Sequence, residues 1–177
     1  MKRIAYFCAL IAASAIAPSA AQAGEIFGGA YVHDVKLPTD LSGIEGGTDF
    51  MIGYRGGTAL KPFGVALQPY VFGALNTSGE TDYAAAGLSA RFGLGKTLYI
   101  RPGLGLAIHD GSASRFFRRD RIAFGSRVLF EPELGIGAQL NNRVSVEASW
   151  VHMSHATLFS GENPGIDNLG VRLNLAL

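Results

Sequence analysis

Strict alternation between large apolar residues and small or polar ones is the feature that most constrains this chain. Over residues 98–108 the even positions are mainly Leu and Ile, and the odd positions hold Tyr, Arg, Gly and Ala. The same period of two recurs over 128–140, 144–150 and 169–177. Because successive side chains of a strand point to opposite faces, this pattern predicts strands with two chemically different sides.

Four less regular segments show the same alternation, so we expect eight strands. The further segments are residues 25–33, 49–55, 66–76 and 83–92. Both a soluble sandwich and a membrane barrel would alternate in this way, so the polarity of the two faces has to separate them.

One face of these strands is aliphatic and aromatic, whereas the other holds Gly, Ala, Ser and isolated charges. Apolar residues make up 48% of the chain and charged residues only 16%, which is too few charges for a soluble outer surface. The pattern predicts an all-β fold: an eight-stranded antiparallel transmembrane β-barrel of the outer membrane, with the apolar side facing lipid. In its narrow interior we expect Arg101 to pair with Glu131 and Glu133.

The predicted connections are short at one end of this barrel and mostly long at the other. With the first strand starting in the periplasm, the short turns are 56–64, 93–96 and 141–142. The connections on the outside are 34–47, 77–82, 109–126 and 155–166. Short periplasmic turns with longer outer loops are typical of outer-membrane barrels.

The first 23 residues predict a secretory signal. Lys2 and Arg3 precede an apolar run, and Ala21-Gln22-Ala23 is a typical cleavage sequence. We therefore expect residues 24–177 to form one barrel domain, integral to the outer membrane. The single cysteine, Cys8, lies in the signal, so the mature chain has no disulfide and no thiolate ligand. The net charge of +1 argues against a nucleic-acid partner, and no residue spacing indicates a metal or another cofactor.

Two histidines and a serine lie together in the sequence HMSH at 152–155. By parity, His152 and Ser154 continue the lipid-facing side of the strand over 144–150, where unpaired polar groups cost free energy. Side chains two apart on a strand are parallel and about 7 Å apart, so a histidine base can approach a serine nucleophile. Asp167 lies on the lipid-facing side of the last strand and would orient the imidazole if the register sets it beside His152.

The same residues allow two other interpretations. A strand end near the headgroups is an ordinary place for His and Ser to bond water or lipid, and the pattern alone slightly favours this structural role over catalysis. Glu162 is a second acid within reach in the sequence, but it lies in the middle of a loop, where parity indicates no direction.

The segment 152–177 resembles the lipid A 3-O-deacylases of the PagL type. These are outer-membrane barrels of eight strands with a His-x-Ser motif near the end of strand seven and an acid after an Asn-Pro-like turn. The matching residues are His152-x-Ser154 and the sequence NPGID at 163–167. The resemblance implies that His152 is the general base, Ser154 the nucleophile and Asp167 the orienting acid.

The chain departs from that family at two positions. The family often has Asn after the serine, where it stabilises the oxyanion, and often has Glu as the acid; this chain has His155 and Asp167. The oxyanion would then be bound by a His155 N–H or by the backbone amides of His155 and Ala156.

The connection over 109–126 carries a cluster of basic side chains on the expected outer side. Arginine can bind the phosphates of lipopolysaccharide in a bidentate way, although a solvated basic loop is an equally good interpretation. The arginines concerned are Arg115, Arg118, Arg119 and Arg121.

The function predicted from all these features is that of an outer-membrane serine esterase that hydrolyses the 3-O-linked acyl chain of lipid A. Its partners would be lipopolysaccharide of the outer leaflet, membrane lipid and, as a further candidate, a second copy of the chain. The alternative is a non-enzymatic small barrel, an adhesin or envelope-stability protein. An acyltransferase would need an acceptor site that the sequence does not reveal.

Overall fold

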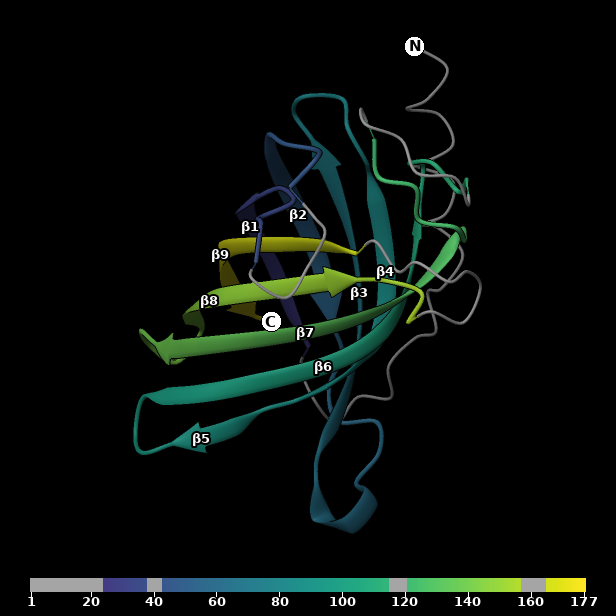
Figure 1. Cartoon of the computed structure of the whole chain (residues 1–177). Helices are drawn as coiled ribbons and strands as arrows, with labels where there is room; N and C mark the ends of the chain where they lie inside the picture. Colours follow the sequence, from purple (N-terminus) through teal and green to yellow (C-terminus); the bar gives the residue numbers. More distant parts are fainter. Residues whose placement is uncertain (1–23, 38–42, 115–120, 157–164) are drawn as a thin grey trace.

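The chain forms an all-strand barrel (Figure 1). In the computed structural model, the described residues are 24–37, 43–114, 121–156 and 165–177, so the expected signal segment lies outside them. The strands are β1 (Glu25–Val32), β2 (Thr48–Arg55), β3 (Leu67–Asn76), β4 (Tyr83–Ala90), β5 (Phe92–Leu94), β6 (Leu98–His109), β7 (Val128–Gln139), β8 (Val144–Met153) and β9 (Ile166–Ala176). A short 3-10 turn, η1 (Pro62–Gly64), lies between β2 and β3. Within these ranges, no helix is long and apolar enough to cross a membrane.

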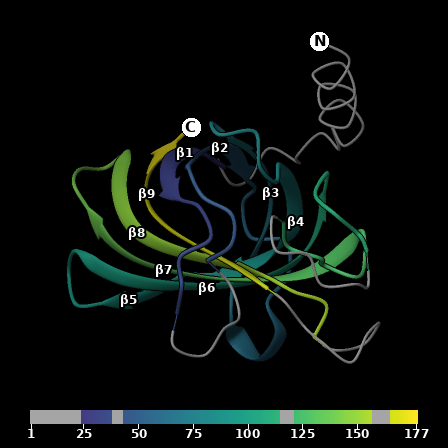
Figure 2. The same ribbon diagram turned by 45° about the horizontal axis from the view of Figure 1, so that its top comes forward.

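Antiparallel pairing runs through neighbouring strands and closes on itself. The order is β4-β3-β2-β1-β9-β8-β7-β6-β5, and β4 also pairs with β6. The short β5 follows β4 after Arg91 and pairs with the same strand, β6, so the two act as one barrel strand. The first and last strands, β1 and β9, lie side by side (Figures 1 and 2). The expected closed barrel of eight antiparallel strands is thereby confirmed.

The sequence pattern predicts the strand ends to within three residues, and the largest differences lie at the long-loop end, where β8 stops and β9 begins. There β8 continues to Met153 and β9 starts at Ile166, because the two strands pair over this whole length. The pattern ends early because His152 and Asp167 place polar side chains on the otherwise apolar face of these strands.

Side-chain exposure follows the predicted parity. On β6, Leu98, Leu104 and Leu106 are exposed, whereas Tyr99 and Arg101 are almost fully buried. The exposed apolar residues continue around the other strands, including Ile52 and Phe50 on β2 and Val171 and Leu173 on β9. In an outer-membrane barrel this outer surface contacts lipid.

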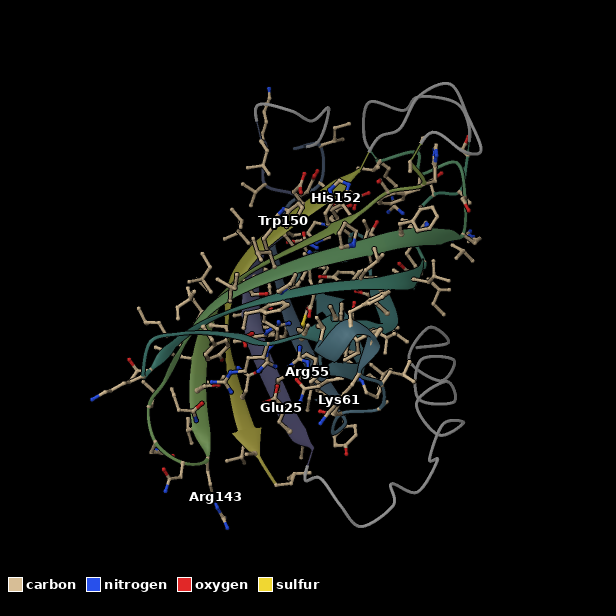
Figure 3. The ribbon with its side chains drawn as sticks, turned by 90° about the horizontal axis from the view of Figure 1, so that it is seen from below. Glu25, Arg55, Lys61, Arg143, Trp150 and His152 are labelled. Carbon is tan, nitrogen blue, oxygen red and sulfur yellow. The ribbon has the colours of Figure 1, made fainter. Side chains whose placement is uncertain are left out.

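The interior contains a network of buried ion pairs. Glu133 accepts hydrogen bonds from Arg172 at 2.8 Å and from Arg55 at 3.3 Å. Arg101 pairs with Glu25 and with Glu147. Glu25 also pairs with Arg55, and Figure 3 labels both residues. Charges at membrane depth are tolerated when they face the interior and pair in this way.

The expected pairing of Arg101 with Glu131 and Glu133 is wrong. Glu131 accepts a hydrogen bond from Tyr70, and Glu133 forms ion pairs with Arg55 and Arg172. The barrel is narrow enough for a long arginine side chain to reach Glu25 on the opposite wall. Parity indicates which side of a strand a residue occupies, but not which strand across the interior it will meet.

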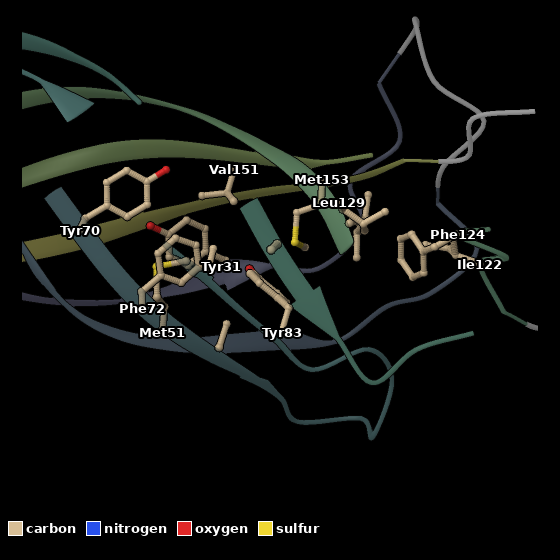
Figure 4. Close-up of a cluster of buried hydrophobic side chains, with 14 of the residues drawn as sticks. Tyr31, Met51, Tyr70, Phe72, Tyr83, Ile122, Phe124, Leu129, Val151 and Met153 are labelled. Carbon is tan, nitrogen blue, oxygen red and sulfur yellow. The ribbon is translucent and has the colours of Figure 1, made fainter. Parts of the chain in front are cut away.

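Aromatic and apolar side chains fill the rest of the interior (Figure 4). Phe72 stacks on Tyr70 with centroids 6.1 Å apart and meets Tyr83 edge-on at 6.0 Å. Nearer the long loops, Met153 and Leu129 are buried, and Ile122 and Phe124 cover them from the connection after β6. The lumen is therefore a packed core.

A polar cluster joins three of the long connections over the barrel mouth. His33 lies after β1 and contacts Asp49 at 2.8 Å and Glu45 at 3.2 Å. The Glu45 carboxylate also accepts the backbone N–H of Thr81 at 3.2 Å and of Ile122 at 3.1 Å. One carboxylate thus binds the connections after β1, β3 and β6 to each other.

A protonated His33 forms ion pairs with Glu45 and Asp49 and so strengthens this cluster. Burial alone would lower the pKa of His33, but hydrogen bonds to Asp49 and Glu45 outweigh it and raise the pKa from 6.5 to about 9. Burial raises the pKa of Glu45, but the bond to His33 and those from Thr81 and Ile122 outweigh it and lower the pKa below 4.5.

The stability of the barrel should therefore depend on pH in two windows. The contribution of His33 is fully present below pH 6.5 and is lost as the pH rises through about 9. The contribution of Glu45 is present above pH 4.5 and is lost as the pH falls through its lowered pKa. In a pH series of thermal unfolding, His33→Gln should abolish the decline between 6.5 and 9.

His109→Gln is the matched control. Its Nε2 donates to the Ser126 carbonyl at 2.7 Å and not to a carboxylate, so this variant should keep the wild-type slope. An unchanged slope in His33→Gln would contradict the role of His33.

Candidate active site

The register between β8 and β9 brings the sequence-predicted base and acid together. His152 and Asp167 are direct antiparallel partners, and Trp150 lies opposite Leu169 two residues earlier. Directly opposite residues on one face have Cβ atoms about 5 Å apart. The neighbourhood expected for His152 and Asp167 is therefore present.

The imidazole of His152 and the carboxylate of Asp167 are hydrogen-bonded. His152 Nδ1 donates to Asp167 Oδ1 at 2.9 Å. The His152 side chain is 21% exposed and that of Asp167 only 3%. Because the Nδ1 proton is directed at the carboxylate, Nε2 is the nitrogen that can accept a proton from another group.

Trp150 is the residue of this cluster that sequence analysis missed. Its indole Nε1 donates to Asp167 Oδ1 at 2.6 Å, and its ring stacks on His152 with centroids 5.8 Å apart and an interplanar angle of 26°. Figure 3 shows Trp150 and His152 beside each other on β8. The signal was present in the sequence: Trp150, His152 and Ser154 occupy alternate positions on one face.

Ser154 lies just past the end of β8, and its pairing with Phe130 places it on the same face as His152. Its backbone N–H donates to the Phe130 carbonyl at 3.1 Å, and its own carbonyl accepts the Phe130 N–H at 2.8 Å. Between this pair and the main β7–β8 ladder lies Pro132, which has no N–H to donate. Two backbone hydrogen bonds to Phe130 therefore hold the serine against β7, past the point where Pro132 interrupts the ladder. Ser154 is largely buried.

The connection after β1 holds the start of β9. The N–H of Val35 donates to the Asp167 carbonyl at 2.6 Å, and that of Asp34 donates to Asn168 Oδ1 at 2.9 Å. Asp34 Oδ2 in turn accepts the N–H groups of Ile44 and Glu45. The polar cluster at the mouth therefore continues to the backbone of the acidic residue.

Of the remaining predicted site residues, the structure describes His155, Ala156 and Arg121. The His155 side chain is fully buried, and Ala156 is exposed with a left-handed backbone, φ 51°. Arg121 is exposed, and the predicted phosphate-binding residues Arg115, Arg118 and Arg119 lie outside the described residues. Over the ranges described, no group of His, Cys, Asp or Glu could hold a metal ion.

Comparison with known proteins assigns the chain to a family. The sequence model of the family described as "Lipid A 3-O-deacylase (PagL)" matches residues 52–176, most of the chain. The chain belongs to the lipid A 3-O-deacylase (PagL) family. Its reaction is accordingly hydrolysis of the 3-O-linked acyl chain of lipid A, and its location is the outer membrane.

Solved structures agree with the barrel fold of this PagL family member. The crystal structure of the outer membrane enzyme PagL superposes with a TM-score of 0.59 and 17% identity, covering 86% of this chain and 99% of that one. Neisserial surface protein A (NspA) gives 0.52 and 12%, covering 87% and 97%. No curated protein sequence matches the chain.

Gly165 limits the space around the His152 ring. A Cβ at this position would lie 2.6 Å from Cε1 and 3.2 Å from Nε2 of His152. In Gly165→Ala the free end of the ring must move, which costs the fold little but displaces the imidazole from Asp167. With His152 as the general base predicted from the sequence, we expect deacylation to fall at least about tenfold, since a small misplacement of a reacting group is costly, while the barrel still folds.

The measurements are lipid A mass spectrometry together with the heat-dependent gel mobility of the folded barrel. Gly46→Ala is the control, because nothing lies within 4 Å of a Cβ there. Full activity in Gly165→Ala would show that the position of the ring does not matter.

Proposed function

We propose that Ser154, His152 and Asp167 act as a catalytic triad in the deacylation of lipid A. The observation that carries this proposal is the 2.9 Å hydrogen bond from His152 Nδ1 to Asp167 Oδ1 on the lipid-facing side of the barrel. Placing a carboxylate and an imidazole on the lipid-facing side of a membrane protein costs free energy, and polar groups paired in this way mark functional sites.

The chemistry follows from the protonation of the imidazole. His152 Nε2 takes the Ser154 hydroxyl proton while Oγ attacks the ester carbonyl of the acyl chain. The tetrahedral intermediate collapses as His152 returns the proton to the departing 3-oxygen of the sugar, which leaves an acyl-enzyme. Water then attacks the acyl group with the same histidine as base, releasing the fatty acid and free Ser154. Asp167 stabilises the imidazolium in both steps.

The oxyanion needs donors close to Ser154. We assign this role to an N–H of His155 or to the backbone amides of His155 and Ala156. The left-handed backbone of Ala156, φ 51°, supports the assignment, since residues in this sparsely populated conformation cluster at active sites.

The packed interior supports entry of the substrate from the side. Ion pairs and aromatic rings fill the lumen, whereas His152 lies on the outer surface. The acyl chains of lipid A would then stay in the membrane against the apolar outer surface while the ester reaches Ser154. Arg121, which is exposed, would contact lipid A phosphates together with Arg115, Arg118 and Arg119.

The rival function, a non-enzymatic barrel, is not favoured by the family match. It also offers no reason for a hydrogen-bonded His152–Asp167 pair on the lipid-facing side. The expected homodimer has no support from the comparisons.

Ser154→Ala tests the triad directly. Removal of the nucleophile should lower deacylation on the order of a thousandfold or more, with no change in folding. The measurement is mass spectrometry of lipid A from cells that hold equal amounts of each variant in the outer membrane, scored by loss of one 3-hydroxyacyl group.

Ser149→Ala is the matched control, since it removes a hydroxyl from the interior side of the same strand, where Ser149 is buried. It should leave lipid A deacylation at the wild-type level. A Ser154→Ala protein as active as wild type would exclude Ser154 as the nucleophile.

A further inference from the structure

The indole of Trp150 is used differently from that of an ordinary lipid-facing tryptophan. Tryptophans on the outside of membrane barrels gather at the interfaces, where the N–H reaches water or headgroups. Here Nε1 instead donates to a carboxylate of its own chain, Asp167 Oδ1, at 2.6 Å. A role in anchoring the barrel does not require this bond.

Both donors to Asp167 use the same oxygen. Trp150 Nε1 and His152 Nδ1 each donate to Oδ1, at 2.6 and 2.9 Å. Two N–H groups arriving from one strand fix the direction of the carboxylate more closely than one would. The arrangement depends on register, because His152 lies directly opposite Asp167 and Trp150 lies on the diagonal.

The His152 ring is also confined from two directions. Trp150 stacks on it at 5.8 Å, and beside its Cε1 and Nε2 edge there is no room for a side chain at position 165. The half-buried indole helps to shield the carboxylate, whose residue is only 2% exposed. One side chain therefore sets the plane of the base and the direction of the acid.

We propose that Trp150 is a positioning residue of the deacylase, which holds Asp167 through its indole N–H and His152 through its ring face. This inference rests on the triad proposed above and adds to it a fourth side chain. Trp150 acts through Asp167 and His152 and takes no part in proton transfer.

Trp150→Phe separates the two contributions of the indole. Phenylalanine keeps an apolar ring beside His152 but has no N–H for Asp167. Loss of one hydrogen bond to a charged group should lower kcat about tenfold, with KM nearly unchanged because the indole holds catalytic groups and not the substrate. The acidic side of the rate–pH profile should also move to higher pH. Without the indole N–H, the Asp167 carboxylate interacts more strongly with the His152 imidazolium.

Leu134→Ala is the matched control. Leu134 lies directly opposite Trp150 on β7 and faces the same side, so this variant removes apolar surface beside the indole without touching Asp167. It should retain the wild-type kcat and pH profile. Equal effects in both variants would mean that Trp150 serves only as lipid-facing surface, and would overturn the proposal.

A second measurement does not depend on activity. Trp150 is the only tryptophan of the chain, so selectively excited tryptophan emission reports this site alone. Protonating the stacked His152 should quench the emission of the folded wild type in detergent, and His152→Gln should abolish that pH response. A wild type and a His152→Gln protein with the same emission at every pH would overturn the stacked arrangement.

The two proposals can fail separately. Loss of activity in Ser154→Ala with a fully active Trp150→Phe would leave the triad in place and remove Trp150 from it. Full activity in Ser154→Ala together with a wild-type fluorescence response would remove the triad while the Trp150–His152 contact stands.

Discussion

The whole structure depends on the need to satisfy backbone hydrogen bonds where no water is available. A strand in lipid must give every N–H and C=O to a neighbouring strand, and only a closed sheet leaves no edge. Pairing of β1 with β9 and of β4 with β6 meets this condition. Because closure fixes which strands are neighbours, it also fixes which side chains meet on each surface.

Closure of the barrel creates an interior and an outer surface that hold different kinds of polar groups. Inside, long arginines such as Arg55 and Arg101 reach across the barrel to Glu133 and Glu25, which fills the lumen with paired charges. Outside, the apolar surface is interrupted by Trp150 and His152, whose hydrogen bonds converge on Asp167. A packed interior leaves the outer surface as the place where a lipid substrate can meet polar chemistry.

The proposed site joins rigid and irregular parts of the fold. His152 and Trp150 belong to β8 and Asp167 to β9, so the β8–β9 ladder sets their separation. Ser154 lies just beyond the ladder and is held by its bonds to Phe130. The bond from Val35 to the Asp167 carbonyl connects this region to the cluster around Glu45. Regular strands thus support the acid and base, and the loop cluster supports the point where β9 begins.

The sequence by itself determined the strands, their two faces and the barrel, because a period of two and the contrast between the faces are local properties of the chain. It also placed His152, Ser154 and Asp167 on one side by parity. Only the tertiary structure decided the partners. Arg101 pairs with Glu25 across the lumen and not with Glu131 or Glu133 as expected. Trp150 donates a hydrogen bond to Asp167. Such contacts depend on register and on barrel closure, which arise from hydrogen bonding between segments distant in the chain, so no pattern within a single strand contains them.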